Sequence, residues 1–211
     1  SLAADGGAAD AQFNLGNIYL AGLTGTQDYA QAMQLYREAA DQGYGLAATN
    51  IGGLYAAGLG VQQDYQQAMI WYEMGADSGD TRAMVGVGDL YLKGEGVSRD
   101  YAEAIHWLTR AAILKSPQAA EGLGYMQFYG LGEPKDEPAA IKWFTTAADE
   151  GDFGAILFIA SVYDHGGFGL EKDPVKAKAL FARAADHEIA TYAELAEELH
   201  DIIGAHKGYP D

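Results

Sequence analysis

Hydrophobic positions recur along this chain with the spacing of an amphipathic helix, and the pattern itself returns every 36 residues. The three tryptophans, Trp71, Trp107 and Trp143, are each 36 residues apart. Around them the chain repeats two short amphipathic segments joined by a glycine-containing loop, most clearly in residues 83–112. A fixed period of this length indicates an array of helical hairpins, each stacked on the next.

The first segment of each repeat is predicted to form a helix with one broad apolar face. An alanine marks its start, at Ala11, Ala47, Ala83, Ala119 and Ala155. The residues four and seven positions later are apolar, and the residue eight positions later is tyrosine in four repeats, including Tyr55 and Tyr91. At about 100° per residue these positions form one stripe, which is typical of a helix buried against several neighbours.

Glycines occur at two fixed positions of this first segment. Five residues after the alanine they are Gly16, Gly52, Gly88 and Gly124. A glycine inside a helix costs about 1 kcal/mol relative to alanine, so we expect a close approach by a neighbouring helix here. Eleven residues after the alanine they are Gly22, Gly58, Gly94, Gly130 and Gly166. These are expected to end the helix in the left-handed conformation.

The second segment of each repeat is predicted to be a helix that packs on the first. An aspartate precedes it in every repeat, at Asp28, Asp64, Asp100, Asp136 and Asp173. Aspartate at this point accepts hydrogen bonds from the free N–H groups of the first turn, so all five are expected to be N-caps. Alternating small and large side chains follow, and the structural core is predicted to include the three tryptophans, Tyr55, Tyr91, Gly52, Gly88 and Gly124.

These spacings divide the chain into repeats with predicted boundaries at 11–46, 47–82, 83–118, 119–154 and 155–190. Residues 1–10 resemble the tail of an earlier repeat, because Ala4 and Gly7 lie 36 residues before Ala40 and Gly43. The chain is therefore expected to be a fragment, and a signal peptide cannot be judged from it. Residues 191–211 are predicted to form a polar closing helix and a tail.

Composition restricts the classes of partner. The net charge of −17 argues against binding to nucleic acid or to anionic lipid. No apolar run approaches the length needed to cross a membrane, so membrane insertion is not expected. Residues 119–154 contain seven acidic and two basic side chains. Two explanations remain open for this acidity, a solvated surface that aids solubility and a face for a basic partner.

No arrangement of residues predicts a catalytic centre, and we expect the protein not to be an enzyme. The five histidines do not form the H-E-x-x-H pattern of a zinc site, and no serine lies in G-x-S-x-G. The chain has no cysteine, which excludes disulfides and thiolate metal ligands. No metal and no cofactor is therefore expected. The residues specify neither the cellular compartment nor the oligomeric state.

The repeated unit A-x-x-x-(L/I/V)-G-x-x-Y-x-x-G-x-G-V-x-x-D-Y-x-x-A-x-x-W-Y is clearest in residues 47–72 and 83–108. It resembles the Sel1-like repeat, a longer-looped relative of the tetratricopeptide repeat, over about residues 1–190. The resemblance implies an all-α, right-handed superhelix (solenoid) of antiparallel helix pairs, with the first helices lining a concave face. It also implies a non-enzymatic scaffold or adaptor for protein–protein interaction, a role common among bacterial members.

The resemblance leaves two alternatives. Some cysteine-rich members are linked to β-lactam binding or hydrolysis, but this chain has no cysteine and no S-x-x-K motif. The other alternative is a structural spacer within a larger bacterial protein.

The resemblance places the positions two, six and nine residues after each alanine on the concave face. With their neighbours, these positions give the candidate partner-binding residues Phe13, Asn14, Asn17, Asn50, Arg82, Val85, Asp89, Leu92, Glu121, Tyr125 and Phe128. The apolar members are expected either to anchor a protein or peptide partner or to be buried by the curvature of the array. The asparagines are expected to bond a peptide backbone. No lysine or arginine is expected beside them, which argues against a clamp for a terminal carboxylate.

Overall fold

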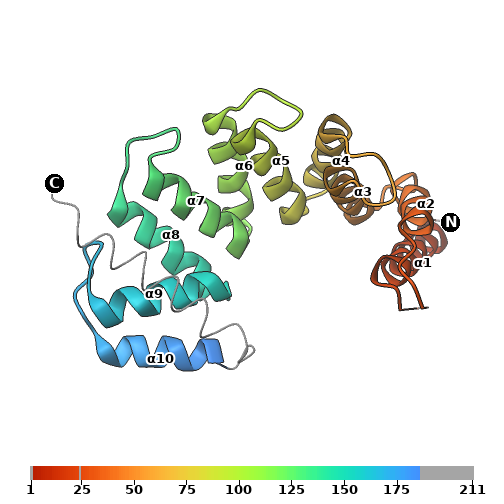
Figure 1. Cartoon of the computed structure of the whole chain (residues 1–211). Helices are drawn as coiled ribbons and strands as arrows, with labels where there is room; N and C mark the ends of the chain where they lie inside the picture. The colour runs from red at the N-terminus through yellow and green to blue at the C-terminus, as the bar shows by residue number, and fades with distance from the viewer. Residues whose placement is uncertain (1, 24, 186–211) are drawn as a thin grey trace. The chain divides into compact units, whose positions relative to one another are not determined.

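The computed structural model describes residues 2–23 and 25–185 (Figure 1). Over these residues the chain forms ten helices and no strand, with one isolated bridge between Gly167 and Leu170. The helices are α1 (Leu2–Ala21), α2 (Tyr29–Ala40), α3 (Gly45–Ala57), α4 (Tyr65–Asp77), α5 (Thr81–Lys93), α6 (Tyr101–Ile113), α7 (Pro117–Tyr129), α8 (Glu137–Asp149), α9 (Phe153–His165) and α10 (Pro174–Ala185). The predicted all-α array of helical hairpins is confirmed.

The helices belong to two compact units, divided after Ala111. In the first unit α1 packs on α2, α2 on α3, α3 on α4, and α4 on α5. In the second unit α7 packs on α8, α8 on α9, and α9 on α10. Each unit is thus built as a stack of helix pairs, the arrangement of an α-solenoid.

In α1, α3, α5 and α7 the glycine inside the helix lies against a large side chain of the second helix of the same repeat. A β-carbon at Gly52 would lie 2.6 Å from Cδ1 of Tyr72, and one at Gly16 would lie 2.6 Å from Cε1 of Tyr36. Leu108 and Phe144 occupy the same place beside Gly88 and Gly124. The predicted close approach is therefore confirmed, and the group that approaches is a side chain of the second helix.

The same large side chain also contacts the first helix of the following repeat. The ring of Tyr72 lies between α3 and α5, because a β-carbon at Gly86 would lie 2.8 Å from its Cε2 atom. Asn50, one repeat earlier, stands 36 residues before Gly86 and lies beside Tyr36. Each ring therefore joins the two helices of its own repeat to the next repeat.

Gly58, Gly94 and Gly130 take the left-handed conformation predicted for helix ends, whereas Gly166, with a ψ angle of 156°, does not. Gly58 and Gly94 have φ angles of 67° and 74°, and their N–H groups donate to Leu54 and Leu90 of the preceding helix. Gly60 and Gly96, also left-handed, lie directly against Tyr29 and Tyr65 at the starts of α2 and α4. The loop after each of these first helices therefore packs on the second helix of the preceding repeat.

All five predicted N-caps are confirmed by hydrogen bonds from backbone N–H groups to the aspartate side chains. The first helices carry caps of their own, which the sequence analysis did not identify. Asp80, Ser116 and Asp152 accept from the N–H groups of Arg82, Ala119 and Ala155. These helices accordingly begin two residues before their marker alanines.

The apolar stripe of the first helices is buried in α3, α5, α7 and α9, where Ile51 and Val87 are fully enclosed. In α1 the prediction is wrong for Leu15, which is 41% exposed. The reason is that no second helix precedes α1 in the described part of the chain. Residues 2–10, predicted to be the tail of an earlier repeat, are the first turns of α1. The predicted closing helix lies outside the described residues.

The tryptophans and motif tyrosines are half-buried at the edges of the core. Trp71, Trp107 and Trp143 each pack on one hydrophobic cluster. Tyr55 and Tyr91 are also half-buried, and the Tyr55 hydroxyl accepts a hydrogen bond from Arg37. The buried centre consists mainly of alanine, leucine and isoleucine together with Tyr36, Leu108 and Phe144, whereas Tyr72 is half-buried.

Gly52→Ala is expected to lower the free energy of unfolding by about 1–2 kcal/mol. Overpacking against Tyr72 costs about 1–3 kcal/mol and outweighs the gain of about 1 kcal/mol in helix propensity. Urea unfolding followed by circular dichroism measures the change. Gly53→Ala is the matched control, because its β-carbon would meet Tyr72 only at 3.7 Å, and it should be neutral or stabilising. Equal stability of the two variants would contradict the ring–glycine contact.

Lys115→Gly is expected to stabilise the second unit by about 0.5–1 kcal/mol. Lys115 has a φ angle of 65°, and it stands where earlier and later repeats carry Gly43, Gly79 and Gly151. Its ion pair with Glu150 is exposed and contributes little. Lys115→Ala removes the ion pair but keeps a β-carbon, so it separates the two effects in the same unfolding experiment. A glycine variant no more stable than the alanine variant would exclude backbone strain.

Candidate functional site

The structure gathers the candidate binding residues into two groups, one in each unit. In the first unit Asn50 and Arg82 line a cavity formed by residues of α1, α3, α4 and α5, and Asn17 is hydrogen-bonded to Asn50. In the second unit Glu121 and Tyr125 lie together on α7. The remaining candidates are less exposed than expected or stand apart from both groups.

The asparagines are held in place by a tyrosine of α2. The Tyr36 hydroxyl donates to Oδ1 of Asn17 at 2.7 Å, and Nδ2 of Asn50 donates to the same oxygen at 3.1 Å. Burial raises the pKa of Tyr36, while a hydrogen bond from Asn50 and the charge of Arg82 act in the opposite direction. Among the described residues, Nδ2 of Asn17 and Oδ1 of Asn50 have no partner, so each amide keeps one group for a ligand.

An arginine stands beside these amides, which corrects the expectation that none would. Arg82 pairs with Asp80 through Nη2 and Oδ2 at 2.9 Å and through Nε and Oδ1 at 3.3 Å. Burial acts to raise the pKa of Asp80, but hydrogen bonds from Arg82 and Thr49 outweigh it and lower that pKa. The Arg82 side chain is 57% exposed and the Asp80 side chain 6%. The guanidinium is therefore anchored on one edge and open on the other.

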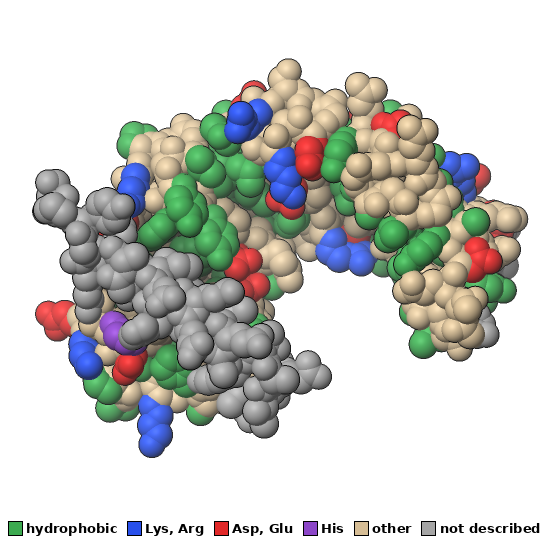
Figure 2. All heavy atoms as spheres, viewed as in Figure 1, with side chains coloured by type: hydrophobic (Ala, Val, Ile, Leu, Met, Phe, Trp, Pro, Cys, Tyr) green, Lys and Arg blue, Asp and Glu red, His purple; other side chains and the backbone are tan. Residues whose placement is uncertain are grey.

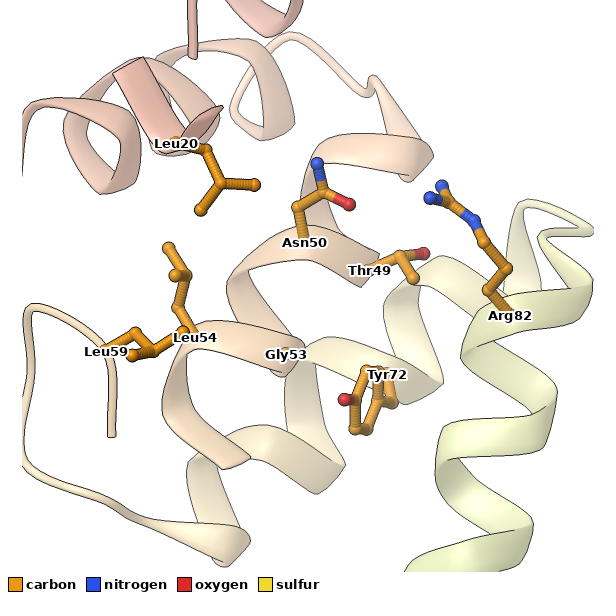
Figure 3. Close-up of a pocket in the computed structure, with 8 residues that line it drawn as sticks. All are labelled: Leu20, Thr49, Asn50, Gly53, Leu54, Leu59, Tyr72 and Arg82. Carbon is orange, nitrogen blue, oxygen red and sulfur yellow. The ribbon is translucent and has the colours of Figure 1, made fainter. Parts of the chain in front are cut away.

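The cavity has a volume of about 300 Å³ and combines an apolar side with a polar side. In Figure 3, Leu20, Leu54 and Leu59 lie on one side, and Thr49, Asn50 and Arg82 lie on the other. Gly53 and Tyr72 complete the lining. Such a cavity can hold an apolar side chain while its polar side bonds the adjoining backbone.

Three of the candidates on α5 are half-buried, so they do not form an exposed binding surface along this helix. They are Val85, Asp89 and Leu92. Burial raises the pKa of Asp89, and Lys93 partly opposes this shift. Burial likewise raises the pKa of Tyr72, and the charge of Asp89 adds to the effect. Asp89 thus acts electrostatically on a wall of the cavity.

Phe13 and Asn14 of α1 have different surroundings. The Phe13 ring packs on Tyr36 and Tyr44 with centroids 5.8 and 5.0 Å away, so it is a half-buried part of the first core. Asn14 is exposed and makes no contact with the cavity residues.

In the second unit two tyrosines on α7 stack on each other in solvent. The rings of Tyr125 and Tyr129 lie 6.4 Å apart at 13°, and the residues are 47% and 62% exposed. Tyr125 also meets Phe144 edge-on at 5.1 Å, which fixes its orientation. Figure 2 shows hydrophobic side chains gathered over α7, with acidic side chains near them.

Phe128 points into the core of the second unit. Its ring packs on Phe168 at 5.6 Å and on Tyr129 at 5.0 Å, and Lys135 lies over it at 5.2 Å. Of the two alternatives for the apolar candidates, burial applies to Phe128 and exposure applies to Tyr125. Thr49, Leu157 and Ser161, which occupy corresponding positions of other repeats, are buried.

Glu121 carries the largest electrostatic perturbation in this unit. Burial, followed by the negative charge of Asp152, raises its pKa to about 7. Its Oε1 atom lies 3.2 Å from the place that a β-carbon of Gly154 would occupy, so the carboxyl group contacts the start of α9. Burial and the charge of Glu121 in turn raise the pKa of Tyr125.

Sequence reasoning missed Tyr72 as a lining residue of the cavity, and it missed Tyr36 and Asp80 as the residues that bond Asn17 and Arg82. The two tyrosines were assigned to packing, which their rings do serve. The available signal was the choice of tyrosine over phenylalanine or leucine, since only tyrosine adds a hydroxyl at the edge of the ring. Asp80 could have been recognised from Asp80-Thr81-Arg82, a capping residue just before a helix.

Within residues 2–23 and 25–185, no three histidine, aspartate or glutamate side chains form a group that could hold a metal ion. None of the described helices is both long enough and apolar enough to cross a membrane.

Comparison with known proteins identifies relatives of the whole array. The profile of the Sel1 repeat matches residues 9–44, 45–80, 81–116, 117–152 and 155–188. A protective antigen with an SLR fold from uropathogenic Escherichia coli is 32% identical, with a TM-score of 0.74 over 88% of this chain. This chain spans only 40% of that protein. No curated protein sequence matches.

Two other solved structures are similar. A Sel1 repeat protein from Oxalobacter formigenes is 26% identical, with a TM-score of 0.78, over 94% of this chain and 88% of its own. An immunity protein from Pseudomonas aeruginosa is 20% identical, with a TM-score of 0.63, over 84% of this chain and 68% of its own. The latter likeness shows the fold alone.

Glu121→Gln is expected to raise the free energy of unfolding by about 1–2 kcal/mol near pH 8, after allowance for solvent screening. The folded-state pKa of about 7 lies above the ordinary 4.5, so folding favours the protonated carboxyl group. That contribution is fully present below pH 4.5 and is lost as the pH rises through about 7. Urea unfolding at several pH values measures the difference. Glu73→Gln is the control, because Glu73 is an exposed residue of α4. A pH-independent effect of Glu121→Gln would contradict the raised pKa.

Proposed function

The chain belongs to the Sel1 repeat family, and on this premise we propose that it is a non-enzymatic interaction module that binds an extended segment of a protein partner. Sel1 repeats commonly serve as scaffolds for protein–protein interaction. The observation that carries the proposal is the cavity lined by Asn50 and Arg82, with Asn17 hydrogen-bonded to Asn50. The role of any longer protein that contains this array is a separate question.

The two asparagines suit the backbone of an extended peptide. A peptide unit offers one donor and one acceptor, and an asparagine side chain offers the complementary pair. Nδ2 of Asn17 would donate to a backbone carbonyl, and Oδ1 of Asn50 would accept from a backbone N–H. Because Tyr36 already orders both amides, little side-chain entropy is lost when a ligand binds.

The rest of the cavity supports selectivity for one side chain of the peptide. Leu20, Leu54 and Leu59 form an apolar wall for an aliphatic side chain. Opposite them, the exposed edge of Arg82 can donate to a carbonyl or carboxylate oxygen of the same segment. The proposed ligand is therefore an extended peptide with an aliphatic residue flanked by hydrogen-bonding backbone.

Selection from a library of displayed random peptides, followed by calorimetry on the selected sequences, tests the proposal. Asn50→Ala is expected to weaken binding by about threefold to tenfold, the effect of losing one neutral hydrogen bond. Arg82→Met keeps the aliphatic stem and removes the donors, so a similar or larger loss is expected. Gln66→Ala, on the exposed surface of α4, is the matched control and should bind normally.

Two results would overturn the proposal. One is a failure of the selection to yield any peptide that binds the folded protein. The other is a set of selected peptides that bind Asn50→Ala and Arg82→Met as tightly as they bind the wild type. Circular dichroism of each variant confirms that folding is retained.

A further inference from the structure

We propose that Tyr125 and Tyr129, together with the carboxylates of Glu121 and Asp152, form a second recognition site that takes a lysine or arginine side chain of a bound peptide. The inference rests on the proposed function, because it assigns one chemical feature to the same kind of ligand. It concerns only residues of the second unit, and the cavity described above belongs to the first unit.

The two tyrosine rings form an aromatic platform in solvent. They lie four residues apart on α7, nearly parallel, and both are largely exposed. The edge-on contact with Phe144 holds the Tyr125 ring, so its open face is ordered before a ligand arrives. A cation over such a face is stabilised by about 0.5–1 kcal/mol at an exposed site.

The chain itself places cations on several of its other aromatic rings. Lys135 lies 5.2 Å from the centre of Phe128, and Lys176 lies 4.9 Å from the centre of Tyr163. Within the described residues, no lysine or arginine lies over Tyr125 or Tyr129. These two rings are therefore available to a cation supplied by another molecule.

Negative charge surrounds the platform. The charges of Glu121 and Asp152 both reach the Tyr125 hydroxyl. Of the two basic residues in this acidic stretch, Lys135 is already paired with Glu137 at 2.8 Å. A partner with positive charge would thus gain both a cation–π contact and charge complementarity. The proposal therefore explains the acidity of residues 119–154 as a face for a basic partner, and not as a solvated surface alone.

The carboxyl group of Glu121 is expected to make the affinity for a basic ligand depend on pH. The charged group that acts on it is Asp152, at the start of α9, and Glu121 in turn acts on Tyr125 of its own helix; from α8, Phe144 packs on the Tyr125 ring. A bound cation favours the ionised form of Glu121, so cation binding and loss of its proton are coupled. Affinity for a basic ligand should therefore rise as the pH increases through about 7.

A metal ion is a poorer occupant than an organic cation. Hard cations such as Ca²⁺ need six or more oxygen ligands, whereas aromatic faces supply none. Two carboxylates beside two tyrosine rings match an ammonium or guanidinium group on an aliphatic stem, since the stem covers the ring and the charge meets the carboxylates.

Calorimetry with a glycine–serine peptide that carries lysine at every third position tests the inference. The same peptide with acetylated lysines is the control, because acetylation removes the charge. The lysine peptide is expected to bind at least about tenfold more tightly than the acetylated one, and more tightly at pH 8 than at pH 6. Equal binding of the two peptides would overturn the site.

Matched variants locate the binding. Tyr125→Leu with Tyr129→Leu keeps apolar area and removes the ring faces, and it should weaken binding by about fivefold. Glu121→Gln should weaken it at pH 8 and flatten its pH dependence. Tyr101→Leu and Asp149→Asn change a ring and a charge elsewhere and should bind as the wild type does. Wild-type affinity in the double leucine variant would exclude the platform.

The two proposals fail in different ways. If selected peptides bind through Asn50 and Arg82 but contain no basic residue and ignore the leucine variants, the cation site is wrong and the interaction module stands. If the lysine peptide binds through the platform but no peptide depends on the first-unit cavity, the cation site stands alone. If no peptide of either kind binds, both are wrong.

Discussion

A large side chain pressed against a helix glycine is the contact on which the rest of this structure depends. In the first unit Tyr36, Tyr72 and Leu108 lie where a β-carbon of Gly16, Gly52 or Gly88 would stand. The glycine weakens its own helix by about 1 kcal/mol, but it allows the second helix to seat a whole ring in the interface. Burial of that side chain stabilises the fold by more free energy than the glycine costs in helix propensity.

This contact also determines which residues remain for binding. The ring packs on one face of the first helix, and the exposure of the other positions differs from repeat to repeat. Where Asn50 replaces the glycine of the next repeat, the tyrosine hydroxyl gains a polar neighbour and the amide of Asn17 joins the group. In the second unit, Tyr125 packs on Phe144 with one edge and keeps 47% of its surface exposed.

Much of the fold could be predicted from the sequence because the residues that begin and end its helices act over short distances along the chain. A left-handed glycine and a capping aspartate each satisfy backbone groups within a few residues, so the spacing of Gly94 and Asp100 was enough to assign them. The helix glycines were also found, since a repeated cost needs a compensating contact. The side chain that makes this contact could not be assigned from one helix alone.

The binding residues were harder to predict because exposure depends on neighbours from other repeats. Corresponding positions of different repeats differ in solvent exposure: Tyr125 is exposed, whereas Ser161 is buried. Arg82 was identified, but its place beside the asparagines follows from stacking α5 on α3. The raised pKa of Glu121 arises from burial and from Asp152, a residue 31 positions later in the chain.

The contacts of the loop glycines make the two ends of each repeat different. Gly60 and Gly96 lie against Tyr29 and Tyr65, the first residues of the preceding second helices. Tyr72 likewise reaches forward to Gly86 of the following repeat. Each of these repeats is completed by its successor, so its two ends are not equivalent. Removing a repeat would therefore uncover the second helix of the one before it, and loosening of the array would spread toward the N-terminus from such a break.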